Sequence, residues 1–339
     1  MIKYLFLLFI GCAQVTSLNL QKHQFGQIPT KIVWIQVAGL SEEHLALLKY
    51  SYPSTNIKTN FESALCVGKT WEYNLFKLRP SAQEGFLSQI TGKKNIKGSC
   101  EDYSLKPIWS YLGSKNYKVG IFETKTTKEQ SLLASKDCDN AKDYLDDLYF
   151  WKMTPSIPKS ADLFHVGEDT QFKTDRVYYD RSCKTGECFS TFASNVEKTF
   201  TSFTRNNKNY LYIIRDFQFS NDLKKRKVKD ARAQLEQLNK IIGDFAVLAE
   251  KSNDFMLLVT SSESYNVTFP RSGNEWESYE KKGKFLKNDK SQLISPLFVY
   301  GARSENFCGI YDQSEILGRI FSGAKQQGLE FTILNPFSE

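Results

Sequence analysis

Three oxygen-bearing side chains at the ends of predicted elements could act on a phosphate or sulfate group. Ser81 stands directly before a predicted helix that begins at Ala82. A helix N-terminus offers free N–H groups and a positive dipole end to an anion, so a hydroxyl there could attack a bound ester. Asp216 and Glu263 each follow an apolar run, and their carboxylates could form an oxygen-only site for magnesium or calcium.

Apolar runs of strand type alternate with helical patterns over most of the chain. The runs are residues 31–37, 117–122, 209–215, 255–261 and 296–301. The clearest helix has apolar residues at three- and four-residue steps, namely Val228, Ala231, Leu235, Leu238, Ile242 and Phe245. This alternation predicts an α/β fold with a doubly wound, mostly parallel sheet and helices on both faces.

The order of these motifs resembles the superfamily of alkaline phosphatases, sulfatases and nucleotide pyrophosphatases, over about residues 30–325. In that superfamily a Ser, a Thr or a formylglycine-forming Cys begins a helix that ends in Thr-Gly. Counting back ten residues from Gly92 gives Ala82, whose methyl group cannot attack phosphorus or sulfur. Ser81 is one residue away, but that shift turns a helix position by roughly 100°. We expect Ser81 to cap the helix, with a displaced nucleophile as the alternative.

The resemblance also implies metal-ligand positions, and most of them are altered here. The first strand of the family delivers a metal-binding Asp at the position of Ala38. Asp216 matches a ligand position, but Ser220 stands where a His follows it. Ser262 and Glu263 stand in the place of a metal-binding Asp-His pair, and the late His of the family has no counterpart. We therefore expect no cofactor, with a divalent metal such as zinc, magnesium or calcium as the alternative.

Histidine is scarce, because the whole chain contains only three. None of them falls at a ligand position of the resembled motifs. His44 lies among leucines on the first predicted helix, where we expect a surface or half-buried structural residue. His165 lies near carboxylates and is the one His that we consider as a metal ligand.

The first residues have the pattern of an export signal. Lys3 gives a positive start, an apolar run over residues 4–10 follows, and small residues precede Leu18. This predicts a signal peptide over residues 1–17, and the run is too short for a transmembrane span. A lipoprotein signal over residues 1–11, with a lipid anchor at Cys12, is the alternative. We expect a bacterial protein that is periplasmic or secreted.

Residues 18–339 are predicted to form a single alkaline-phosphatase-like domain. The region of about residues 124–205 departs from the regular rhythm of strands and helices, and the resemblance implies a cap-type insertion there. The cysteines beyond the signal number an even six, which favours disulfides in an oxidising compartment. They are Cys66, Cys100, Cys138, Cys183, Cys188 and Cys308. Cys183 and Cys188 bracket a turn with Gly186, so we expect them to pair, while the other pairings stay open.

The chain is mildly basic, with a net charge of +7 and its densest basic run at residues 223–229. This run begins the long amphipathic helix and lacks interleaved aromatic residues, so it favours a solvated face over a nucleic-acid-binding surface. We expect no nucleic-acid partner. An envelope protein or an anionic ligand of the cell envelope is expected instead.

The sequence leaves two hypotheses for the function, which belong to different classes. The first is an exported non-catalytic protein that binds an envelope ligand or a protein partner without turnover. The second is a divergent metal-dependent hydrolase of phosphate or sulfate esters that uses Ser81 with Asp216, Glu263 and His165. The altered family positions favour the first.

Overall fold

One mixed sheet runs through the whole computed structural model, which describes residues 28–51, 58–184, 186–284 and 292–322. Its strand order is β10-β2-β9-β8-β1-β7-β3-β4-β6-β5. The strands are β1 (Lys31–Ala38), β2 (Cys66–Trp71), β3 (Lys118–Thr124), β4 (Leu148–Met153), β5 (Asp162–Phe164), β6 (Arg176–Asp180), β7 (Tyr210–Asp216), β8 (Phe255–Ser262), β9 (Ile294–Gly301) and β10 (Gly309–Asp312).

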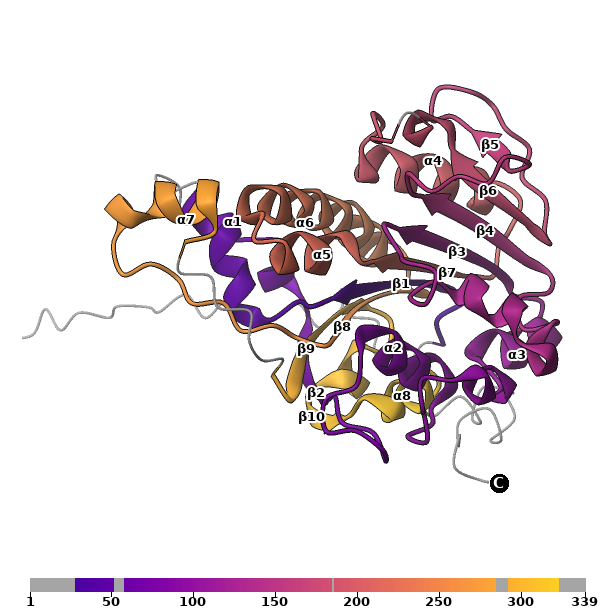
Figure 1. Ribbon diagram of the computed structural model, residues 1–339. Coiled ribbons are helices and arrows are strands. Elements are labelled where there is room, and N and C mark those ends of the chain that lie inside the picture. Colours follow the sequence, from indigo (N-terminus) through magenta and orange to yellow (C-terminus); the bar gives the residue numbers. More distant parts are fainter. Residues whose placement is uncertain (1–27, 52–57, 185, 285–291, 323–339) are drawn as a thin grey trace, which may run out of the picture.

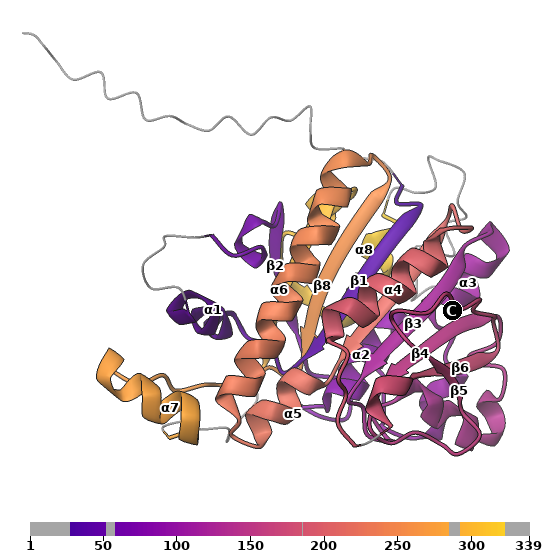
Figure 2. The ribbon, with the colours of Figure 1, turned by 90° about the horizontal axis from the view of Figure 1, so that it is seen from above.

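Most neighbouring strands are parallel, and β9 alone in the described sheet runs against its neighbours β8 and β2. Helices cover both faces, with α4, α5 and α6 on one side and α2, α3 and α8 on the other (Figure 1, Figure 2). The predicted doubly wound, mostly parallel α/β sheet is therefore confirmed. The helices are α1 (Leu45–Ser51), α2 (Ala82–Thr91), α3 (Ile108–Leu112), α4 (Phe192–Thr204), α5 (Gln218–Lys224), α6 (Val228–Lys251), α7 (Trp276–Lys282) and α8 (Ile316–Ile320).

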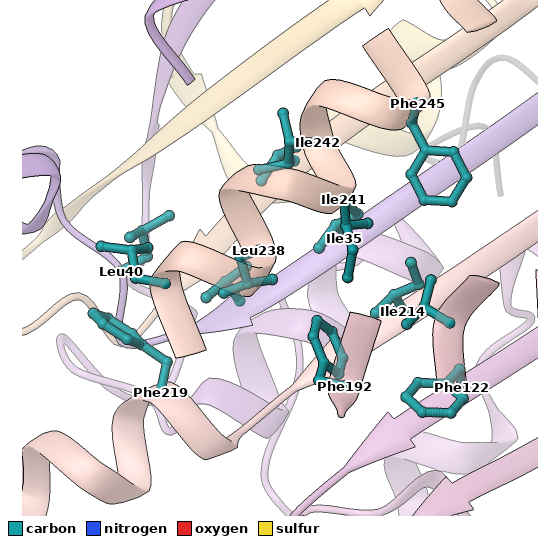
Figure 3. Close-up of a cluster of buried hydrophobic side chains, with 14 of the residues drawn as sticks. Ile35, Leu40, Phe122, Phe192, Ile214, Phe219, Leu238, Ile241, Ile242 and Phe245 are labelled. Carbon is teal, nitrogen blue, oxygen red and sulfur yellow. The ribbon is translucent and has the colours of Figure 1, made fainter. Parts of the chain in front are cut away.

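The core lies in two layers because successive side chains of a strand point to opposite faces of the sheet. On β1, Val33 and Ile35 join the cluster beneath α6, whereas Ile32 and Trp34 join the cluster on the α2 side. Figure 3 shows Ile241 and Phe245 of α6 in the first cluster. All six apolar residues predicted for the long helix are buried, which confirms its inward face.

The six cysteines of the predicted mature chain form three disulfides. Cys183 pairs with Cys188, as predicted. The pairs that the sequence left open are Cys66 with Cys308 and Cys100 with Cys138. Disulfides are typical of proteins in oxidising compartments. None of the helices within the described ranges combines the length and apolar character that a membrane crossing requires.

The region of residues 124–205 contributes to the domain in two ways. Strands β4, β6 and β5 extend the main sheet beyond β3, and α4 packs against the same face as α6. The segment between β3 and β4 instead folds over the carboxyl ends of the strands, where Thr127 and Cys138 line a cavity. The predicted signal segment and Cys12 lie outside the described residues.

Two segments differ from a simple reading of the sequence. Residues 309–312 form the edge strand β10, which pairs with β2, and α8 follows. The basic run at residues 223–229 spans the end of α5, a short link and only the first turn of α6. Its lysines at 224, 225 and 227 are exposed, so a solvated face is confirmed.

Candidate functional site

The parallel strands place the predicted site positions side by side at their carboxyl ends. Val37 of β1 is in register with Asp216 of β7, and Ala38 is in register with Ser262 of β8. The fold therefore brings Ala38, Asp216 and Ser262 together from distant parts of the chain.

A small apolar cluster fills the centre of this arrangement. Ala38 and Ala82 are buried against Phe86 and Phe217, and the two Phe rings meet edge to face with their centroids 5.7 Å apart. Ala38 and Ala82 are the positions where the sequence resemblance predicts a metal-binding Asp and the nucleophile. Methyl groups and phenyl rings neither coordinate a metal ion nor attack an ester, so the cluster supplies neither function.

The N-terminus of α2 is taken up by side chains of the protein itself. The Ser81 hydroxyl accepts a hydrogen bond from the Glu84 N–H at 3.3 Å, and the Glu84 carboxylate accepts from the Ser81 N–H at 2.8 Å. Ser81 is thus the predicted N-cap. The Glu263 carboxylate accepts from the Ala82 N–H at 3.3 Å and lies 3.4 Å from the Lys224 ammonium. An internal anion therefore occupies the end of the helix dipole that could receive a phosphate.

Asp216 is fully buried, and its carboxylate oxygens are already hydrogen-bonded. They accept from the backbone N–H groups of Gln218 and Phe219 and from the side-chain amide of Gln234. Burial raises the pKa of Asp216 to about 7 despite these hydrogen bonds. Through these hydrogen bonds Asp216 anchors the start of α5.

The remaining family positions do not supply metal ligands. The Ser220 hydroxyl donates to the Phe217 carbonyl, as expected for a helical serine. Ser262 is buried beside α2, where a Cβ at Gly85 would overlap its hydroxyl. Nowhere in the described ranges do three His, Cys, Asp or Glu side chains gather closely enough to hold a metal ion. The residues present therefore do not fit the metal centre that the resemblance implies.

Neither of the two described histidines belongs to a group of potential metal ligands. His165 follows β5, which is four strand positions from β7, so roughly 19 Å of sheet separates them at the usual strand spacing. His165 therefore cannot join Asp216 in one site. His44 is fully buried rather than surface-exposed or half-buried. Its Nδ1 accepts from the Ser41 N–H at 2.9 Å, and burial lowers its pKa to about 3.

Sequence reasoning missed a buried polar row that crosses five strands, two residues before the end of β1 and one residue before the end of β7. At its centre, the Arg215 guanidinium donates to the Glu123 carboxylate at 2.5 Å and to the side-chain carbonyl of Gln36 at 3.1 Å. It also donates to the side-chain carbonyl of Gln83 on α2. The signal was available, because each of these strands carries a polar residue in an otherwise apolar run. The row consists of Thr260, Gln36, Arg215, Glu123 and Lys152.

A cavity of about 610 Å³ opens beside the N-terminus of α2. Ser81, Ala82 and Glu263 form one wall, and the Cys100–Cys138 disulfide contributes to another. Gln83 and Tyr103 are buried lining residues joined by a 3.3 Å hydrogen bond. A cavity of this size suits a small molecule. The predicted site region therefore contains a cavity, but this cavity lies beside the apolar cluster.

Comparison with solved structures identifies the fold. An alkaline phosphatase from the Antarctic bacterium TAB5 superposes with a TM-score of 0.67 at 13% identity, covering 88% of this chain and 99% of that chain. The cold-active alkaline phosphatase of a Shewanella species gives 0.68 at 11% identity, with 86% and 99% covered. The Thermus thermophilus alkaline phosphatase gives 0.64 at 12% identity, with 94% and 95% covered. The resemblance to the alkaline phosphatase superfamily is thus confirmed for the fold.

No protein-family model and no curated protein sequence matches the chain. The solved structures nevertheless correct one expectation. Two TAB5 alkaline phosphatase variants with this fold hold magnesium, so the prediction that no cofactor is involved is wrong at the level of the fold, which points to a divalent metal. The described residues of this chain do not gather into a site for such a metal.

Proposed function

We propose that this protein is an exported, non-catalytic member of the alkaline phosphatase fold that binds a ligand or a protein partner of the cell envelope. This proposal is supported by the apolar cluster of Ala38, Ala82, Phe86 and Phe217, which lies where the resemblance predicts the nucleophile and the first metal ligand. Nucleophilic attack and metal-ion charge stabilisation supply much of the rate enhancement in two-metal hydrolases. The cluster provides neither.

The cavity beside α2 supports a binding role. It is lined by buried polar groups such as Gln83 and Tyr103, and Arg215 holds Gln83 in place from below. The Cys100–Cys138 disulfide ties two lining segments together. A preorganised polar wall of this kind favours recognition, because little conformational entropy is lost when a ligand binds. Export is supported by the three disulfides and by the signal-like N-terminal pattern.

The proposal is tested by assaying the purified full chain with aryl phosphate, phosphodiester and aryl sulfate substrates, each with added magnesium, zinc or calcium. We expect no turnover by the wild type above that of the Ser81→Ala variant under any of these conditions. The alternative hydrolase would use Ser81 with Asp216, Glu263 and His165. Metal-stimulated turnover that Ser81→Ala or Asp216→Asn abolishes would establish that alternative and overturn the proposal.

A further inference from the structure

The loop between β2 and α2 exposes large apolar side chains at one end of the molecule. Leu75, Phe76 and Leu78 are 67%, 54% and 75% exposed, respectively. The loop projects from the β2–β10 end of the sheet in Figure 1. Single exposed apolar residues are common, but three within four positions on one loop mark a contact surface.

Hydrogen bonds within the loop and to the segment after α2 hold the loop in this conformation. The side-chain carbonyl of Asn74 accepts from the N–H groups of Phe76 and Lys77 at 2.8 and 2.7 Å. The Asn74 amide donates to the Ile96 carbonyl at 3.0 Å, and the Leu75 N–H donates to the Lys94 carbonyl at 3.1 Å. The chain therefore turns tightly and is tied to the segment after α2, so the apolar side chains cannot fold back into the core.

Basic side chains surround the apolar ones. Lys77 and Arg79 alternate with them in the loop, and Lys93, Lys94 and Lys97 come from the segment that the loop contacts. Lys97 lies over the Phe76 ring, with its ammonium 5.7 Å from the centroid. Lys94 lies over the Tyr73 ring at 4.8 Å.

The charges near the loop are not fully balanced by acidic neighbours. Lys77, Lys94 and Lys97 pair with Glu84, Asp312 and Glu101. Arg79 and Lys93 make no ion pair with any described residue, so the surface has an excess of positive charge.

We propose that this loop, residues 72–80, docks the protein on a lipid bilayer that carries anionic headgroups. Leu75, Phe76 and Leu78 enter the boundary between headgroups and acyl chains, while the cations stay at the level of the phosphates. Aromatic residues at the base of the loop, Trp71 and Tyr73, match the side chains that membranes accommodate at their interface. The surface lies outside the cavity, so this inference does not depend on the proposed ligand-binding function.

Vesicle sedimentation tests the inference. The parent protein for this test is the full chain with the substitution Cys12→Ser, so that no acyl chain at that position contributes to binding. We expect it to sediment with phosphatidylcholine vesicles that contain roughly one third phosphatidylglycerol, more weakly with pure phosphatidylcholine, and less at high salt. The variant Leu75→Ser, Phe76→Ser, Leu78→Ser should bind the anionic vesicles about tenfold more weakly or worse, because each lost side chain removes apolar burial.

Two further variants separate the loop from general effects. Phe189→Ser removes an apolar side chain that is 77% exposed but lies in the segment before α4, and it should bind like the parent. Arg79→Gln with Lys93→Gln should weaken binding only to the anionic vesicles. Thermal midpoints of all variants should match, since the changed side chains are at the surface. The inference is overturned if the parent stays in the supernatant with every vesicle, as it would for a loop that binds a protein, or if the triple variant binds as well as the parent.

Discussion

Arg215 is a charged residue that this fold keeps fully inside the sheet. Its guanidinium pairs with Glu123, and both side chains are at most 1% exposed. Burial alone would raise the pKa of Glu123, but the charges of Lys152 and Arg215 hold it below its ordinary value. The Glu123 carboxylate therefore pairs with two buried cations, and its negative charge offsets the free-energy cost of burying them.

Removing that charge should destabilise the protein strongly. We expect Glu123→Gln to lower the free energy of unfolding by about 3–5 kcal/mol, because Arg215 and Lys152 are left buried without a counter-ion. The matched control is Lys118→Gln on the same strand, whose ion pair with Asp147 is exposed and should be worth less than about 1 kcal/mol. Urea denaturation of both variants measures the difference. Equal, small losses would show that the row does not depend on the charge of Glu123.

From order and spacing alone, the resemblance predicts altered positions at Ala38, Ala82, Ser220 and Ser262, and this assignment stays a prediction. The structure adds what surrounds these residues. That the two alanines meet Phe86 and Phe217 could not be predicted, because the contact joins two strand ends and a helix that are far apart in the chain. The Ser81 cap was predictable, since capping is decided within four residues.

Glu72 joins three elements at the edge of the site. It follows β2, and its carboxyl oxygen accepts from the Ser264 N–H after β8 at 2.9 Å and from the hydroxyl of Ser295 on β9. Burial raises the pKa of Glu72 to about 8, and the charge of Glu263 adds to that shift. The folded protein therefore retains this proton at pH values where the unfolded chain has lost it.

Protonation of Glu72 makes the free energy of unfolding depend on pH. Because the folded state holds more protons than the unfolded state between about pH 4.5 and 8, the contribution of Glu72 is fully present at low pH and is lost as the pH rises through 8. Glu72→Gln imitates the protonated form and should lessen the fall in stability between pH 5 and 9 by roughly 1–3 kcal/mol. Urea denaturation at both pH values measures this. An unchanged pH dependence would mean that Glu72 ionises normally, and Glu277→Gln, at an exposed ion pair, is the control.

Elements with strong local signals were predicted well. The apolar stripe of α6 is where it was predicted, and the strand runs of β1, β3, β7 and β8 lie within two residues of their predicted bounds. Residues 309–312 were not predicted as a strand. Their conformation depends on pairing with β2, more than two hundred residues earlier in the chain, and on the Cys66–Cys308 disulfide nearby. Local patterns do not contain such information.

The whole molecule retains the alkaline phosphatase fold at 11–13% identity to three solved enzymes. A doubly wound sheet can be recognised from the order of its strands and helices, even when few residues match. Function does not follow from the fold in the same way, because it belongs to the side chains at the strand ends. Here those side chains form an apolar cluster, an internal carboxylate at a helix N-terminus and a cavity to one side.

Glu263 and the cluster around Ala82 close the anion-binding position at the N-terminus of α2, in our account. Calorimetric titration of the full chain with inorganic phosphate, in the presence of magnesium, tests this claim. We predict no saturable heat of binding, and the same result for Ser81→Ala, because the Ala82 N–H already has an anionic partner. Saturable binding of one phosphate per chain, weakened when Ser81 or Asp216 is replaced, would contradict the claim.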